Sequence, residues 1–105
     1  MNLLFICSRN QWRSPTAESI FKNQPKIQVR SAGTADSAKN KVTEKLLLWA
    51  DMIFVMEKKH KEILLERFDR EHSKRMIILD IPDDYKYMDP ELVEMIKAGV
   101  APYLE

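Results

Sequence analysis

The only cysteine of the chain precedes an arginine at a spacing that could bind and attack a phosphate group. Cys7 follows an apolar run, and Arg13 comes six positions later, just before a Ser-Pro pair. A loop of this size can surround a tetrahedral oxyanion with backbone N–H groups, and a following helix adds positive potential at its N-terminus. The guanidinium of Arg13 can bind two phosphate oxygens at once, and the same field favours a thiolate at Cys7. These are the parts of a cysteine-dependent phosphatase.

The competing interpretation is a buried cysteine without chemistry. Free cysteine is among the most buried residue types, and an arginine at a given offset arises by chance about once in twenty positions. The context favours the anion site, because an apolar run precedes Cys7, Ser14-Pro15 suits the start of a helix, and Glu18 follows in its first turns. We therefore expect this segment to bind phosphate or sulfate.

Composition predicts a single globular domain over residues 1–105. Hydrophobic residues make up 45% of the chain and charged residues 31%, which is typical of a water-soluble domain. Seventeen basic and sixteen acidic side chains nearly cancel, so nothing indicates a nucleic-acid partner. One cysteine cannot form an internal disulfide, and no segment has the pattern of a signal peptide or a membrane span. We therefore expect a cytoplasmic protein without a membrane partner.

Short apolar runs alternate with helical patterns along the chain. Strands are expected at 3–6, 26–30, 51–56 and 75–80, and helices at 14–22, 43–49, 57–68 and 90–98. This alternation indicates right-handed crossover connections and a parallel sheet covered by helices on both faces.

Ligands of such sheets bind at the carboxyl ends of the strands. Three polar segments should meet there, namely the loop from Cys7 to Arg13, residues 31–34 and residues 80–85. A thiolate that attacks a phosphate ester expels an oxygen anion that needs a proton, and a carboxylic acid in the last segment could supply it. Asp and Pro are also common in turns, which would be the preferred interpretation without the cysteine loop.

The segment from Cys7 to Glu18 resembles the signature of the low-molecular-weight protein tyrosine phosphatases, and residues 31–34, 51–56 and 81–85 resemble later segments of that family in the same order. The resemblance implies a phosphatase-I-like fold, a three-layer αβα sandwich around a four-stranded parallel sheet in the order 2-1-3-4. It also implies hydrolysis of phosphomonoesters through a cysteinyl-phosphate intermediate, without a metal or cofactor. The expected substrate is a phosphotyrosine protein or a small phosphomonoester.

The resemblance assigns the catalytic roles to three residues. Cys7 would be the nucleophile, Arg13 would bind the phosphate, and Asp83 would act as general acid and then as base for the attacking water. In the family a proline follows the acid, whereas here Asp84 follows Asp83. Asp84 is therefore a second candidate for the acid.

Other residues of the resembling segments would support the site. Ser14 would donate a hydrogen bond to the thiolate, and Asn10 would hold the loop in shape with help from Ser31. Tyr85 would line the cleft. The residues expected around the phosphate are Ser8, Arg9, Asn10, Gln11, Trp12 and Ser14.

The chain departs from the family pattern in several places. Ser8 and Arg9 stand where the family commonly has a small apolar residue and a glycine, and Trp12 stands where a second cysteine is frequent. Between Thr34 and Val42 a long segment is missing that forms one wall of the family's substrate cleft. Without further cysteines, an electron relay of the arsenate reductase type is excluded.

A non-catalytic module that binds phosphate or phosphoproteins on the same fold is the alternative function. The missing cleft wall and the Asp83-Asp84 pair keep this alternative open. His60 and His72 lie among charged residues without a third ligand at metal spacing, so we expect them at the solvated surface and expect no metal site.

Overall fold

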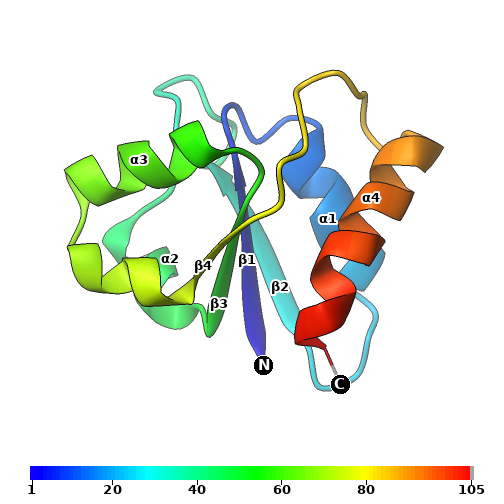
Figure 1. Cartoon of the computed structure of the whole chain (residues 1–105), viewed down its shortest axis with the longest axis horizontal. Helices are drawn as coiled ribbons and strands as arrows, with labels where there is room; N and C mark the ends of the chain where they lie inside the picture. The colour runs from blue at the N-terminus through cyan, green and yellow to red at the C-terminus, as the bar shows by residue number, and fades with distance from the viewer. Residues whose placement is uncertain (105) are drawn as a thin grey trace.

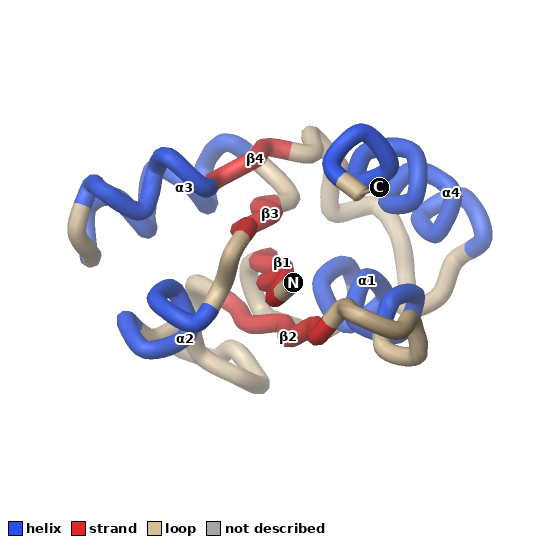
Figure 2. Tube along the Cα trace, turned by 90° about the horizontal axis from the view of Figure 1, so that it is seen from below, coloured by secondary structure: helices blue, strands red, loops and turns tan. Residues whose placement is uncertain are grey.

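A parallel sheet forms the middle layer of the computed structural model, which describes residues 1–104 (Figures 1 and 2). Its strands lie in the order β2-β1-β3-β4, and every neighbouring pair is parallel, which confirms the predicted αβα sandwich. The elements, with η for short 3-10 helices, are β1 (Asn2–Cys7), α1 (Arg13–Phe21), β2 (Gln28–Gly33), α2 (Glu44–Trp49), β3 (Met52–Val55), α3 (Lys58–Arg67), η1 (Arg70–Arg75), β4 (Met76–Ile78), α4 (Pro90–Val100) and η2 (Ala101–Tyr103).

The central strand β1 explains how the sheet is covered. Leu3 and Phe5 pack into a core formed with α1 and α4, whereas Leu4 and Ile6 pack into a second core formed with α2 and α3. All four side chains are completely buried. A strand between two helical layers needs an apolar residue at every position rather than at alternate ones, and for this reason the sequence predicted β1 well. Strand β1 thus lies in the interior of the sheet, between β2 and β3 (Figure 2).

Two predicted helix starts are confirmed by their caps. The Asp89 carboxylate accepts a hydrogen bond from the Glu91 amide at 2.9 Å, with Pro90 at the first helical position of α4. The Thr43 hydroxyl accepts from the Leu46 amide at 3.2 Å at the start of α2. Both residue types satisfy N–H groups that the first turn of a helix leaves without a partner.

The second strand differs from its predicted bounds. It continues to Gly33 instead of ending at Arg30, because residues 31–33 pair in register with Phe5, Ile6 and Cys7 of β1. Small and polar residues at the end of a strand resemble a loop in the sequence. As a result Ser31 belongs to the rigid sheet and not to a connecting segment.

The expectation that both histidines lie at the surface is wrong. His60 and His72 are buried. Arg75 donates a hydrogen bond to Nδ1 of His72, and Nε2 of the same ring lies 2.8 Å from a Glu44 carboxylate oxygen. The charged neighbours in the sequence therefore provide the polar partners of this buried ring instead of marking it as solvated.

Three connecting segments meet at the carboxyl ends of the strands, as predicted (Figure 1). The carbonyl groups of residues 7–9 accept hydrogen bonds from the amides of Thr34, Ala35 and Lys39, at 3.0, 2.9 and 3.0 Å. The segment after β4 reaches the same place, because the carbonyl of Ile81 accepts a hydrogen bond from a side chain of the first loop. The loop after β1 is therefore held from both sides.

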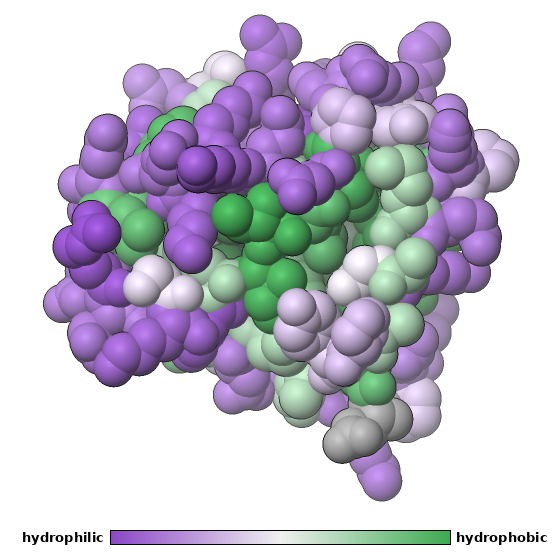
Figure 3. Space-filling view, viewed as in Figure 1, coloured by the Kyte–Doolittle hydropathy of each residue, from purple (hydrophilic) through white to green (hydrophobic). Residues whose placement is uncertain are grey.

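One face of the molecule combines a hydrophobic centre with a hydrophilic margin. On the face seen in Figure 3, hydrophobic residues gather over the middle of the molecule and charged or polar residues surround them. The longest α-helix, α4, has 11 residues, whereas about 20 apolar residues are needed to cross a bilayer. Within residues 1–104, no helix meets the requirements for a membrane span.

Gly33 lies where the chain approaches itself too closely for a larger residue. A Cβ atom at this position would lie 2.5 Å from the carbonyl oxygen of Ser8 and 2.9 Å from the amide nitrogen of Asn10. Both are backbone atoms, so the loop itself would have to move. We predict that Gly33→Ala lowers the free energy of unfolding by about 2–3 kcal/mol, measured by urea denaturation.

Gly99→Ala is the matched control for this prediction. A Cβ atom at Gly99 would contact only the end of the flexible Leu79 side chain, at 2.9 Å, and alanine favours the helix by up to about 1 kcal/mol. Its stability should therefore change little. An equal loss in the two variants would show that the loop does not constrain Gly33.

Candidate active site

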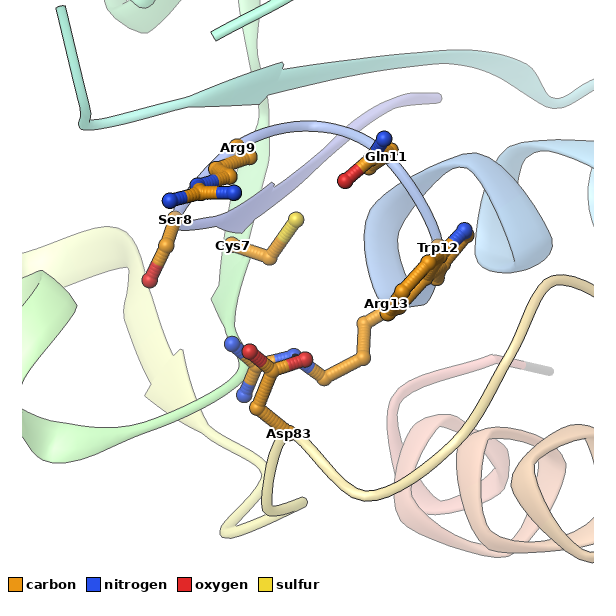
Figure 4. A pocket seen from close by; sticks show the side chains of 7 residues that line it. All are labelled: Cys7, Ser8, Arg9, Gln11, Trp12, Arg13 and Asp83. Atoms are coloured by element: carbon orange, nitrogen blue, oxygen red, sulfur yellow. Dashed lines mark ion pairs between the residues drawn. The ribbon is translucent and has the colours of Figure 1, made fainter. Parts of the chain in front are cut away.

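A pocket of about 320 Å³ opens at the carboxyl end of β1 (Figure 4). Figure 4 shows the Cys7 sulfur inside the arc of the loop, with Asp83 and the Arg13 guanidinium across the pocket. The loop and the segment after β4 thus contribute to a single cavity. Its lining residues are Cys7, Ser8, Arg9, Gln11, Trp12, Arg13 and Asp83.

Cys7 is the last residue of β1, and its sulfur lies at the bottom of the loop. The thiol is buried, and its Sγ lies 2.9 Å from the Ser14 hydroxyl oxygen. The side-chain amide of Asn10 donates to the same hydroxyl oxygen at 2.9 Å. Because Ser14 accepts from Asn10, its own proton can be donated either to the sulfur at 2.9 Å or, over a longer distance of 3.5 Å, to the carbonyl oxygen of Ala32. The arrangement can therefore stabilise a sulfur anion by hydrogen bonding.

Asn10 connects the loop to the neighbouring strand. Its backbone φ is +55°, in the left-handed region that asparagine tolerates better than most residues. Besides Ser14, its amide donates to the Ser31 hydroxyl at 3.0 Å, and Ser31 donates in turn to the Glu18 carboxylate at 2.5 Å. The structure therefore brings Asn10, Ser14 and Ser31 together in one buried network.

The start of α1 differs from the predicted one in a way that affects the site. The helix begins at Arg13, and its N-cap residue Trp12 provides no side-chain cap. Ser14, the predicted cap, directs its hydroxyl toward Cys7 instead. The backbone amides of residues 8–12 donate no hydrogen bond to any residue among 1–104. Free amides next to a helix N-terminus form a site for an anion.

Arg13 is buried and oriented by two fixed acceptors. Its Nη1 donates to a Glu57 carboxylate oxygen at 2.5 Å and to the carbonyl oxygen of Ile81 at 2.8 Å. Its Nη2 has no hydrogen-bond partner within residues 1–104, and its Nε lies 3.6 Å from an Asp83 carboxylate oxygen. The edge of the guanidinium formed by Nε and Nη2 is therefore the one that can bind two oxygens of a phosphate.

Glu57 is a site residue that the sequence motifs do not reveal. It is the N-cap of α3, two residues after the end of β3, and its carboxylate forms an ion pair with Arg13. Burial alone would raise the pKa of Glu57, but the hydrogen bond and the charge of Arg13 hold it below its ordinary value. Its position in the sequence could have indicated this role. An acidic residue at the carboxyl end of a central strand lies at the same edge of the sheet as the loop after β1.

His60 forms the second contact between α3 and the loop. Its Nδ1 accepts a hydrogen bond from the Glu57 amide at 3.1 Å, as part of a capping box, and its Nε2 lies 2.9 Å from the Ser8 hydroxyl. With Nδ1 as acceptor, a neutral ring carries its proton on Nε2 and donates to Ser8. Burial, followed by the positive charge of Arg13, lowers the pKa of His60 to about 4.

Two predicted residues of the acid segment lie elsewhere. Tyr85 was expected to line the cleft, but it is absent from the pocket lining and its ring packs against the core formed with α1 and α4. Asp84 is exposed and does not line the pocket either. Trp12 does line the pocket, with 39% of its surface exposed.

A buried thiol below a loop of free amides, with an arginine at its end and a carboxylate opposite, is the arrangement of a cysteine-dependent phosphatase. The comparisons with known proteins agree. The family model for low molecular weight phosphotyrosine protein phosphatase matches residues 2–48. A protein-arginine-phosphatase of Bacillus subtilis (strain 168) is 30% identical over 101 residues, and the match covers 70% of this chain and 67% of the relative. The chain belongs to the low molecular weight phosphotyrosine protein phosphatase family.

Solved structures share the fold over nearly the whole chain. A mutant of YwlE from Bacillus subtilis is 25% identical, with a TM-score of 0.73 over 98% of this chain and 97% of that one. The low molecular weight protein tyrosine phosphatase SP-PTP from Streptococcus pyogenes is 18% identical, with a TM-score of 0.82 over 99% of this chain and 91% of that one.

The low pKa of His60 predicts a loss of stability in acid. In the unfolded chain this ring binds a proton near pH 6.5, whereas in the folded protein it does so only near pH 4. Between these values the unfolded state binds more protons, so stability falls as the pH falls. We predict that this residue alone removes about 2–3 kcal/mol from the free energy of unfolding by pH 4, measured by urea denaturation at a series of pH values.

His60→Gln separates this contribution from that of other titrating groups. Glutamine suits the same capping-box position and does not titrate. The variant should therefore lose less stability than the wild type between pH 6.5 and pH 4. Parallel pH profiles of the two proteins would contradict the burial of a neutral His60.

Proposed function

We propose that this protein hydrolyses phosphorylated side chains through a cysteinyl-phosphate intermediate, with Cys7 as the nucleophile. The observation that carries the proposal is the common pocket of Cys7, Arg13 and Asp83 at the end of β1. The five unpaired amides of residues 8–12 and the free edge of Arg13 would bind the three peripheral oxygens of the phosphate. In this binding mode the phosphorus atom would lie above the Cys7 sulfur.

The reaction has two steps. The Cys7 thiolate attacks phosphorus and forms the S–P bond, while the bond from phosphorus to the leaving group breaks and the leaving group takes a proton from Asp83. Water then attacks the cysteinyl-phosphate, gives its proton to Asp83 and breaks the S–P bond. Inorganic phosphate leaves, and the thiolate is restored. Both steps use the same acid, first as donor and then as acceptor.

Asp83 is the better candidate for the acid. Its carboxylate lines the pocket and lies 3.6 Å from Nε of Arg13, whereas Asp84 neither lines the pocket nor forms an ion pair within residues 1–104. A phosphate bound to the Arg13 edge would take the place next to Nε. Asp83 would then move toward the leaving group, which lies on the open side of the pocket.

The substrate is a phosphorylated protein residue of one of two classes. Phosphotyrosine is expected from the family, and phosphoarginine is favoured by the relative that is named a protein-arginine-phosphatase. Trp12 provides a flat exposed wall beside the loop, which can pack against a phenol ring or a guanidinium group. Turnover of matched phosphotyrosine and phosphoarginine peptides distinguishes the two classes.

We predict that Cys7→Ser abolishes turnover of p-nitrophenyl phosphate, with a loss of at least about a thousandfold in kcat. The variant should still bind vanadate or phosphate, since the amides and Arg13 remain. Arg13→Ala should instead weaken this binding strongly, because it removes the bidentate edge. Residual turnover by Cys7→Ser would refute the assignment of Cys7 as the nucleophile. Phosphate binding without turnover in the wild type would indicate a non-catalytic binding module.

The choice of acid predicts a difference between two neighbouring variants. Asp83→Asn should lower kcat by about 10²–10⁴-fold with phosphotyrosine peptide, because the leaving phenol must be protonated. The loss should be smaller with p-nitrophenyl phosphate, whose leaving group is a more stable anion. Asp84→Asn is the matched control, with the same change one position later. A larger loss for Asp84→Asn would reverse the assignment.

A further inference from the structure

A second depression lies directly beside the catalytic pocket and shares two of its residues. It has a volume of about 480 Å³ and is lined by Arg9, Gln11, Ser37 and Lys39. Arg9 and Gln11 also line the pocket that contains Cys7. In Figure 4 these two residues lie across the pocket from Asp83. We call this depression, defined by its four lining residues, the cationic groove.

The backbone around the cationic groove is held in place. The amide of Lys39 donates to the carbonyl of Arg9 at 3.0 Å, and the amide of Ala35 donates to the carbonyl of Ser8 at 2.9 Å. Gly33 allows the two segments to approach closely. The two cationic residues are therefore neighbours because of backbone hydrogen bonds, and not because of the flexible position of their side chains.

The positive charge of the cationic groove is not compensated by the protein. The side chains of Arg9 and Lys39 are exposed, and neither forms an ion pair within residues 1–104. The nearest carboxylate along the chain, Asp36, binds Lys41 at 3.1 Å. That hydrogen bond, together with the charges of Lys41 and Arg67, lowers the pKa of Asp36 below its ordinary value. Asp36 is thus engaged elsewhere and leaves two cations beside the pocket.

We propose that the cationic groove binds an acidic side chain of the substrate close to its phosphorylated residue. The preferred substrates would be protein segments in which Asp or Glu flanks the phosphorylated position. Arg9 and Lys39 would attract the carboxylate. The side-chain amide of Gln11 and the hydroxyl of Ser37 can donate hydrogen bonds to it. This inference rests on the proposed function, because the phosphorylated residue must occupy the pocket that contains Cys7.

The chemistry of the groove favours a carboxylate on a protein over a nucleic acid. A nucleic-acid surface needs a row of cations that neutralises many phosphates, whereas this groove has two, and the net charge of the chain is only +1. Two cations next to a phosphate site match one or two carboxylates close in sequence to the phosphorylated residue. Residues of an extended peptide are about 3.3 Å apart, so a flanking side chain can reach a neighbouring depression.

The test is a binding experiment with Cys7→Ser protein, so that it does not depend on turnover. Fluorescent phosphotyrosine and phosphoarginine peptides are compared in two versions, one with Glu and one with Gln on both sides of the phosphorylated residue. We expect the Glu version of the bound class to bind about threefold to tenfold more tightly at low ionic strength. The advantage should disappear at about 0.5 M NaCl, because exposed charges are then screened.

Charge-reversal variants test whether the preference for Glu peptides comes from Arg9 and Lys39. Lys39→Glu and Arg9→Glu should each remove or reverse the preference for the Glu peptide. Lys45→Glu is the matched control: it makes the same change in net charge at an exposed position of α2 outside the groove, and it should keep the preference. Equal binding of Glu and Gln peptides to the unaltered groove, or no binding of any phosphopeptide, would overturn the proposal.

A preference that survives Lys39→Glu, or that is lost equally in Lys45→Glu, would also overturn it, because the overall charge would then be the cause. Failure of the proposed function has a different signature, the absence of p-nitrophenyl phosphate turnover by the wild type. The ratio of kcat/KM for Glu and Gln peptides in the active protein provides a second measurement. The preference should appear mainly in KM, since the flanking carboxylate takes no part in the bonds that form and break.

Discussion

The site depends on one constraint, namely that the loop after β1 must be rigid while its backbone amides stay free. If the N–H groups of residues 8–12 were used to hold the loop, none would remain for a phosphate. The structure meets this constraint by holding the loop through its backbone carbonyl groups and its side chains. The carbonyls of residues 7–9 accept hydrogen bonds from the segment after β2, and Asn10 fixes the middle of the loop through Ser14 and Ser31. Every support therefore comes from outside the anion site.

In Arg13, too, one part of the side chain is held by the protein while another part stays free. A buried guanidinium needs partners for its charge and its donors, and Glu57 and the Ile81 carbonyl occupy one end of it. The opposite edge stays free for phosphate. Because Glu57 is also the N-cap of α3, and His60 in the first turn of α3 binds Ser8, this helix holds both ends of the loop. The same two residues therefore mark the start of α3 and support the loop.

The sequence predicts the fold, the reactive residues and, through the family resemblance, the supporting group of Asn10, Ser14 and Ser31. It does not predict the supports that α3 provides through Glu57 and His60. Apolar runs such as Leu3 to Ile6 are dictated by burial on both faces of the sheet, and the spacing of Cys7 and Arg13 follows from the size of an oxyanion loop. His60 has no such signal, because Lys58, Lys59 and Lys61 surround it and suggest a solvated helix. Its burial depends on a contact with Ser8 that is distant in sequence.

The short connection between Thr34 and Val42 matters in different ways for the two parts of the site. It leaves the catalytic pocket intact, since the supports of Cys7 and Arg13 come from β2, α3 and the segment after β4. It also brings Lys39 next to Arg9, on the side where the family resemblance implies a longer segment. If the cationic groove binds substrate as proposed, recognition on this side depends on exposed charge rather than on an enclosing wall. Exposed charges select partners weakly and in a salt-dependent manner, so this protein should distinguish substrates by their local charge more than by the shape of the phosphorylated side chain.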